Sequence, residues 1–154
     1  MIHWQDSHHT ELSVSALYAA LKLRSEVFVV EQTCIYLDID GDDLVGENRH
    51  LLGWKDDTLV AYARILVSDD EREPVVIGRV IVNTHARGEG LGYQLMEQVL
   101  ASCQQHWPER ALYLGAQAHL HDFYKHFGFV AVTDVYDEDG IPHIGMAREI
   151  LTTP

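Results

Sequence analysis

Residues 75–106 read VVIGRVIV, then NTHARGEGLG, then YQLMEQVLASCQQH. The first part is apolar and β-branched, which predicts a strand buried in a sheet. The last part carries apolar residues at the spacing of one helix face: Leu95, Met96, Val99, Leu100 and Cys103. A strand, a glycine loop and a helix N-terminus together can bind an anion, because the first N–H groups of a helix have no acceptor within it.

The glycine pattern distinguishes between kinds of phosphate-binding loop. A nucleotide-hydrolysing loop needs GxxxxGK[ST], but no Lys-Ser or Lys-Thr follows these glycines. A dinucleotide loop needs GxGxxG and an acidic residue at the end of a second strand, whereas this chain has GxGxG and Glu109 ahead of the next strand. What remains is the pattern R/Q-x-x-G-x-G/A at Arg87-Gly88-Glu89-Gly90-Leu91-Gly92. A purely structural glycine turn is the alternative.

The composition is that of a globular protein, with 47% apolar and 23% charged side chains in 154 residues. This length fits one domain, 1–154, with a sizeable core. The net charge of −13 argues against a nucleic-acid partner, although backbone amides and Arg87 can still hold one phosphorylated cofactor. No apolar run reaches the roughly 20 residues of a membrane helix, and the N-terminus lacks a signal-peptide pattern. We therefore expect no membrane partner and a cytoplasmic protein, with Cys103 in the core.

The other segments predict a mixed α/β sheet. Ser13 would cap a helix that runs to about Glu26 and buries Val14, Leu17, Tyr18 and Leu21. Strands are expected over 2–6, 50–55, 58–67, 111–116, 129–136 and 143–148, with tight turns at 56–57 and 137–142. The central helix should stop before Pro108, and a short helix over 119–127 should end at Gly128.

A second signature follows the central helix. Residues 113–117 (YLGAQ) and 123–129 (FYKHFGF) resemble a strand–helix segment of the GNAT N-acetyltransferases. The 87–92 loop is similar to the pyrophosphate-binding loop of that superfamily. With residues 23–32, 38–43 and 140–146, the chain is identified as a member of its ElaA-type branch over nearly the whole length. Arg24 to Phe28 also resembles the acyl-homoserine-lactone synthases, which are similar in fold and use acylated carriers.

The resemblance implies a sheet splayed between the strands that end near Val82 and Ala116, with acetyl-CoA in the gap. A strand edge left unpaired there offers N–H and C=O groups to the pantetheine arm. The pyrophosphate would lie on the glycine loop. The implied cofactor-binding residues are Ile81, Val82, Arg87, Gly88, Glu89, Gly90, Leu91, Gly92, Gln117 and Phe123.

Acetyl transfer to an amine needs a neutral amine, a stabilised thioester oxygen and a proton for the leaving thiolate. Tyr124 matches the family's general acid; the alternative is a core aromatic packed with Phe123 and Phe127. The base is left unassigned, because the strand 75–82 carries Gly78-Arg79 and no carboxylate. Its candidates are Glu26, Glu31, Asp38, Asp40 and His50.

The acceptor side is expected among residues of the acidic region. Glu31 is interpreted as a base or an acceptor-binding group, and Asp38, Asp40, His50 and Arg79 as acceptor-binding residues. Clustered carboxylates repel one another unless they pair with arginines or await a cation. We favour pairing with Arg64 and Arg79, and we expect an acceptor that carries a protonatable amine.

No metal site is expected. Asp38 to Asp42 resembles a calcium loop, but glycine is fourth rather than sixth and Arg49 stands twelfth, where calcium loops have Glu. His119 and His121 lie two apart, so on a helix they would point to different sides.

Two classes of function follow. The first is an acetyl-CoA-dependent N-acyltransferase (EC 2.3.1.-) acting on a small amine or a protein amino group. The second is a CoA-sensing binding module of the same fold with little or no turnover. The sequence leaves open the acceptor, the acyl-chain length, the base and whether the protein is a homodimer.

Overall fold

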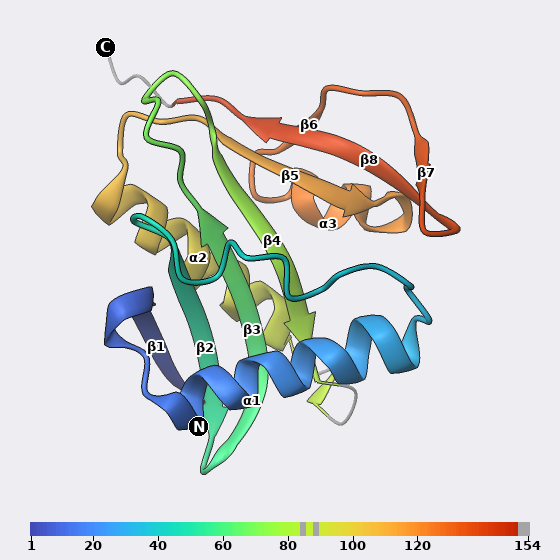
Figure 1. The fold of residues 1–154 in the computed structure, drawn as a ribbon. Helices are drawn as coiled ribbons and strands as arrows, with labels where there is room; N and C mark the ends of the chain where they lie inside the picture. Colours follow the sequence, from blue (N-terminus) through green and yellow to red (C-terminus); the bar gives the residue numbers. More distant parts are fainter. Residues whose placement is uncertain (84–85, 88–89, 151–154) are drawn as a thin grey trace.

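The computed structural model describes residues 1–83, 86–87 and 90–150. An open, twisted sheet forms its centre (Figure 1), with α1 (Val14–Arg24) across one face and α2 (Leu91–His106) and α3 (His121–Lys125) on the other. The predicted fold class, a mixed α/β sheet flanked by helices, is confirmed.

The strands follow the order β1-β2-β3-β4-β5-β8-β6, and β7 also pairs with β8. Neighbours are antiparallel except for β4 and β5. Their bounds are β1 His3–His8, β2 Arg49–Lys55, β3 Thr58–Leu66, β4 Val75–Val82, β5 Leu112–Gln117, β6 Val130–Ala131, β7 Tyr136–Glu138 and β8 Ile141–Arg148. The first five lie within two residues of the predicted strands.

The central strands serve two hydrophobic cores, because successive residues of a strand face opposite sides of the sheet. On β2, Leu51 packs on the α2 side and Leu52 beneath α1. On β3, Ala61 and Ala63 take the α2 side and Tyr62 the α1 side. This burial on both faces explains the nearly continuous apolar runs of these strands.

The predicted buried face of α1 is wrong. Ala16, Ala20 and Leu23 face the sheet, whereas Val14 and Tyr18 are 86% and 70% exposed. The small alanines let the helix lie close to the strands, and the larger side chains are left on the outside. The helix also changes its form at Ser25–Glu31, which continue it as a π-helical segment.

The central helix agrees with its prediction. Its apolar stripe is buried, with Leu95, Met96, Val99 and Cys103 all in the core, and it ends at His106, ahead of Pro108. A 3₁₀ turn at Ala118–Leu120 precedes α3. Gly128 follows α3 with a φ of +91°, as expected for a glycine that ends a helix.

The sheet is splayed between β4 and β5. Only Val75 and Val76 of β4 pair with β5, opposite Leu112 and Tyr113. Beyond them β4 stays paired with β3 and β5 with β8. The inner edges of both strands are therefore unpaired toward Val82 and Gln117, and the predicted splay is confirmed.

A bulge lies in β4 at the start of the splay. Arg64 pairs with Gly78 and Tyr62 with Ile81, so β4 has one more residue than β3 between these pairs. Arg79 lies in the bulge with a φ of +51°. This left-handed conformation is unusual for a residue other than glycine and redirects the Arg79 side chain.

The strand predicted over 129–136 is two short strands, β6 and β7, on the same partner. The ladder is interrupted because the N–H of Gly145 donates to the Thr133 hydroxyl, at 2.8 Å, rather than to a backbone carbonyl. Between β7 and β8 the chain reverses at Asp139 and Gly140, which both have positive φ. Asp-Gly is typical of such a two-residue hairpin turn.

Candidate active site

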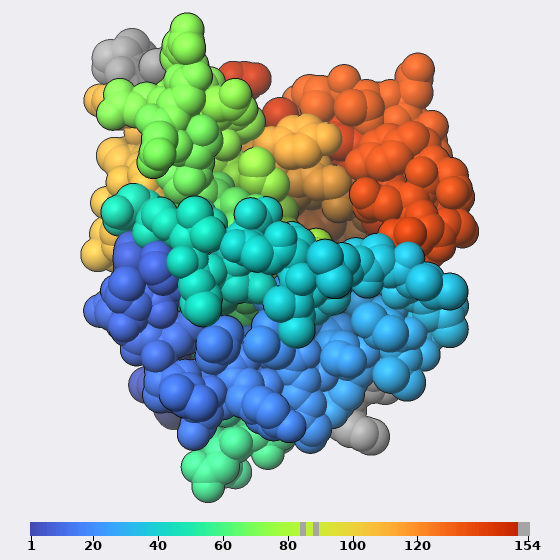
Figure 2. All heavy atoms as spheres, in the orientation of Figure 1, coloured from blue at the N-terminus to red at the C-terminus, as the bar shows by residue number. Residues whose placement is uncertain are grey.

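A cleft of about 970 Å³ follows the splay between β4 and β5. Figure 2 shows its mouth as a hollow between the cyan residues near 33–40 and the orange and red strands β5 and β7. Ile77 to Val82 and Tyr113 to Gln117 line it from the two strands. The cleft therefore occupies the place where strand edges are unpaired.

The π-helical segment forms one wall of the cleft. The N–H of Gln32 donates to the carbonyl of Val27, five residues back, at 2.9 Å. This wider turn brings Phe28, Glu31 and Gln32 to the cleft. Single π turns within helices are frequent at functional sites, and no sequence pattern had indicated this one.

The helix N-terminus at one end of the cleft has no side-chain cap. Gly90 is the N-cap of α2, with a φ of +72°, and no side chain of the described residues bonds to the first turn. By contrast, Ser13 caps α1 through a 3.0 Å bond to the N–H of Ala16. The first turn of α2 also carries no acidic residue. It therefore offers backbone N–H groups and a positive helix end to an anion.

The residues predicted to bind the cofactor lie around this end. Those that line the cleft are Ile81, Val82, Arg87, Gly92, Gln117 and Phe123. Leu91 is buried in the core instead, so only its backbone can take part. Gly88 and Glu89 lie outside the described residues.

Glu31 lies at this same end of the cleft. Its carboxylate accepts two hydrogen bonds from Arg87, at 2.8 and 3.2 Å. Arg87 also donates to the Val82 carbonyl at 3.0 Å. Glu31 is thus held against the glycine-loop arginine, and its predicted role as base or acceptor-binding group stays a prediction.

Tyr124 lies on α3 and lines the cleft, although only 5% of it is exposed. Its ring packs edge-on against Phe123 and Phe129. Burial raises the pKa of its hydroxyl to about 12. Tyr124 is therefore both a core aromatic and a cleft residue, and its hydroxyl carries a proton at neutral pH.

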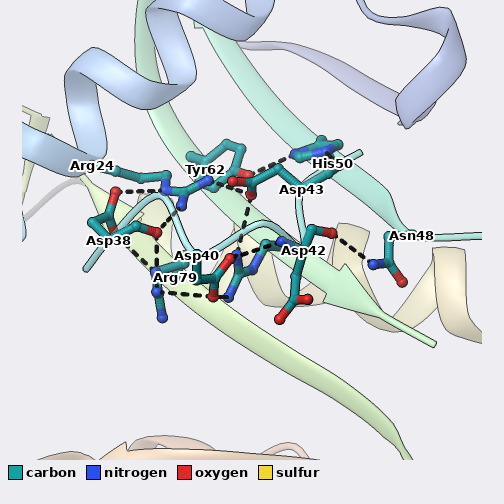
Figure 3. Close-up of polar contacts among 10 residues, drawn as sticks. Arg24, Asp38, Asp40, Asp42, Asp43, Asn48, His50, Tyr62 and Arg79 are labelled. Atoms are coloured by element: carbon teal, nitrogen blue, oxygen red, sulfur yellow. Dashed lines mark hydrogen bonds and ion pairs between the residues drawn. The ribbon is translucent and has the colours of Figure 1, made fainter. Parts of the chain in front are cut away.

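The acidic loop 38–43 is bound by a network of arginines (Figure 3). Arg24 is fully buried, and its guanidinium pairs with Asp38, at 3.0 Å, and with Asp43. Arg64 binds both carboxylate oxygens of Asp40, each at 2.9 Å. The preferred alternative, that the carboxylates pair with arginines, is confirmed.

Arg79 completes this network from the bulge in β4. Its Nε donates to Asp38 at 2.9 Å, so three arginines and three aspartates balance in charge. Although burial alone raises the pKa of Asp40, hydrogen bonds and the Arg64 charge hold that pKa near 2. The network therefore fixes the loop in ionised form above β3 and β4.

His50 is buried beside the network. Its Nε2–H donates to the Asp43 carbonyl at 2.9 Å, and its Nδ1 accepts from the Tyr62 hydroxyl at 2.6 Å. Burial lowers the pKa of His50 and favours this neutral form. Among the expected acceptor-binding residues only Arg79 lines the cleft; His50, Asp38 and Asp40 lie behind its wall. Glu26, another base candidate, is exposed and pairs with Lys22.

The structure adds cleft residues that the sequence reasoning had not singled out. They are Tyr36, Tyr113, Tyr136, Glu138 and His143. For Tyr113 a signal was available: Leu112, Leu114 and Ala116 face the core, so the alternate positions of the same strand face the cleft.

Comparison with known proteins defines the class. The family model described as "Acetyltransferase (GNAT) domain" matches residues 19–150. In sequence the chain is 69% identical to protein ElaA of Escherichia coli strain K12, over 98% of this chain and 99% of the relative. The crystal structure of Escherichia coli ElaA superposes with a TM-score of 0.94, covering 97% of this chain and 100% of that one. The chain belongs to the GNAT acetyltransferase family, in its ElaA-type branch.

Two further structures widen the comparison. An acyl-CoA N-acyltransferase from Pseudomonas aeruginosa is 52% identical, with a TM-score of 0.92, over 96% of this chain and 99% of that chain. The AHL synthase LasI is 15% identical, with a TM-score of 0.80, over 97% of this chain and 90% of that chain. At this identity LasI shares the fold alone.

Two further findings on the described residues concern a membrane span and a metal site. No helix among them is long and apolar enough to span a membrane. They hold no group of three or more His, Cys, Asp or Glu side chains that could bind a metal ion, and the expected absence of a metal stays a prediction.

Proposed function

We propose that the protein is an N-acyltransferase that transfers an acetyl group from acetyl-CoA to an amine. The observation that carries this proposal is one continuous cleft, which passes from the uncapped N-terminus of α2, along the unpaired edges of β4 and β5, to Tyr124. Its parts match the parts of acetyl-CoA: an anionic end, an amide-rich arm and a thioester.

Each wall has a task in this proposal. The backbone N–H groups at Gly90 to Gly92 bind the pyrophosphate, and Arg87 adds a charged contact. The edge of β4 near Ile81 and Val82 pairs with the pantetheine amides. Gln117, which donates to Gln32 at 3.2 Å, closes the opposite side.

The reaction forms one bond and breaks one. The amine nitrogen attacks the thioester carbon, the carbon–sulfur bond breaks, and the nitrogen loses a proton. Tyr124 donates its proton to the departing sulfur, a transfer suited to a hydroxyl that stays protonated at neutral pH. The proton lost by the nitrogen passes to solvent water, and the Tyr124 oxygen regains a proton from solvent, so the protons balance over one turnover.

The test of turnover is CoA-thiol release from acetyl-CoA with a broad panel of amines. Steady, amine-dependent release supports the acyltransferase. Binding of acetyl-CoA without release on any amine would support the CoA-sensing module instead.

The test of the cofactor loop is the substitution Gly90→Val. A Cβ at this position meets no atom within 4 Å, but the φ of +72° is strained for a β-branched residue. We therefore expect the loop to shift and the Kd of CoA, measured by calorimetry, to rise about 10-fold or more, the loss of about one charge-assisted contact. An unchanged Kd would contradict the loop assignment. Gly41→Val, also at positive φ with open space around it, is the matched control and should leave CoA binding intact.

A further inference from the structure

We call the part of the cleft that is lined by Arg64 and Arg79 the acceptor chamber. Its walls are Tyr36, Arg64, Arg79, Tyr113, Tyr136 and the β7–β8 turn at Glu138 and Asp139. Gly78 and Gly115, which have no side chains, also line it. A Cβ at Gly78 would meet nothing within 4 Å, and one at Gly115 would meet the Tyr136 hydroxyl at 3.1 Å.

Arg79 presents a cation to this chamber. Its Nε and Nη2 bind Asp38, and Nη2 also lies 3.4 Å from Asp40. Its Nη1 makes no hydrogen bond with another described residue, and the Tyr36 ring lies 5.1 Å from the guanidinium. The side chain is 19% exposed. The bulge and the positive φ of Arg79 thus hold a half-satisfied guanidinium at the chamber wall.

Arg64 adds a second cation to the same wall. It is only 3% exposed, and its Nη1 and Nη2 bind Asp40 and Asp43. Its Nε is buried with no partner among the described residues. A buried guanidinium N–H without an acceptor is costly and rare in folded proteins.

The carboxylates of the chamber lie on its other side. Arg64 and Arg79 belong to β3 and β4, whereas Glu138 and Asp139 lie at the β7–β8 turn, with β5 between them in the sheet. Glu138 lies 3.3 Å from His143, and Glu31, a further acidic lining residue, is paired with Arg87. Asp38 and Asp40 are behind the wall and neutralised. The chamber therefore has the partly bonded Arg79 guanidinium on one side and carboxylates on the other.

We propose that the acceptor is a small molecule that carries a carboxylate as well as the amine, as an amino acid does. Its carboxylate binds Arg79, and its amine lies toward Glu138. The Nη1 group of Arg79, which no other described residue binds, can donate to a carboxylate oxygen, and such a charge-assisted hydrogen bond is stronger than a neutral one. This inference rests on the proposed N-acyltransferase function and names its substrate class.

The experiment compares amino acids with their own amides, which differ only in the carboxylate. CoA-thiol release gives kcat/KM for each pair. With the wild-type protein we expect the acid to be preferred about 10- to 100-fold, the range for hydrogen bonds to a charged group. In Arg79→Gln that preference should fall to about one, mainly through KM, and Arg79→Lys should restore part of it.

The ratio of kcat/KM for the acid to kcat/KM for the amide distinguishes a loss of carboxylate recognition from a general loss of structure. A variant that only loosens the 38–43 loop would slow acid and amide alike and leave the ratio unchanged, which would overturn the proposal. Arg72→Gln is the control, because Arg72 is exposed and pairs with Asp70 away from the cleft; it should leave the ratio as in the wild type. If the wild-type protein has equal kcat/KM for acids and amides, the proposed carboxylate subsite is also overturned, while the proposed acyltransferase function is not.

Calorimetry keeps the two proposals distinguishable. If no amine releases CoA, the proposed function fails, and binding of acid and amide to the CoA complex is measured instead. Acid binding that depends on Arg79 would still support the carboxylate subsite. Equal or absent binding of acid and amide would overturn it.

Discussion

The two ends of the cleft are held by ion pairs of opposite character. At the proposed cofactor end, beside the N-terminus of α2, Arg87 and Glu31 form one pair whose side chains are 41% and 37% exposed. At the proposed acceptor end three arginines and three aspartates form a network around the fully buried Arg24. Water screens the first pair and is largely excluded from the second.

Similar residues therefore have different roles at the two ends. An exposed pair can open at little cost, so Arg87 remains available to an anionic ligand. A buried network is costly to disturb, because each charge left without its partner remains in a low-dielectric interior. The cofactor end is thus adaptable, and the acceptor wall is fixed.

Tyr124, between the two ends, gives the largest expected effect. If it protonates the leaving thiolate, Tyr124→Phe should lower kcat about 10²- to 10⁴-fold, the usual range for a general acid, with little change in the Kd of acetyl-CoA. Because its pKa is about 12, Tyr124 ionisation should not lower the wild-type rate until the pH approaches that value. Full kcat in the variant, with chemistry rate-limiting, would leave Tyr124 as a core aromatic only.

The buried network gives the next largest effect. Arg24→Ala leaves Asp38 and Asp43 without their buried partner, so we expect the free energy of unfolding to fall by about 3–5 kcal/mol. Denaturant titration measures it. Arg87→Ala is the matched control for the exposed pair and should cost about 1 kcal/mol or less. Equal losses in the two variants would contradict the contrast between the two ends.

The local structure around β4 and α2 was predicted better from the sequence than that around the 38–43 loop, and the reason is physical. β4, Gly90 at the start of α2, and α2 itself are set by local patterns: β-branched residues, a glycine that accepts positive φ, and an apolar stripe. The buried face of α1 is set instead by how closely alanines let the helix approach the sheet. The bulge at Arg79 and the π-helical segment depend on tertiary packing, so no local pattern marked them.

At the 38–43 loop, nearness in the sequence was a poor guide to which charges pair. Asp38 and Asp40 looked available for a cation, because no basic residue follows closely in sequence. Their partners come from α1, β3 and β4, 14 to 41 residues away. The sequence offered pairing with arginines as an alternative. Only the fold shows which of these groups line the cleft and which lie behind its wall.

The smallest expected effect concerns the exposed pair, and it is a gain in CoA affinity rather than a loss of function or stability. Glu31→Gln removes the carboxylate that Arg87 contacts, so Arg87 becomes freer to bind the pyrophosphate. An exposed ion pair is worth at most about 1 kcal/mol, and we expect the Kd of CoA to fall about two- to fivefold at low salt. Because salt screens exposed charges, the gain should shrink as ionic strength rises. Pantetheine, which lacks the pyrophosphate, should bind both proteins equally.

Glu26→Gln is the control for Glu31→Gln, because it removes the same charge a few residues away, where Glu26 pairs with Lys22 outside the cleft. It should leave the Kd of CoA nearly unchanged. A different result, in which Glu31→Gln lowers kcat and shifts the pH profile of kcat while CoA binds as before, would identify Glu31 as the base. Glu31 would then pair with Arg87 only until the cofactor binds, and would afterwards be free to accept a proton from the amine.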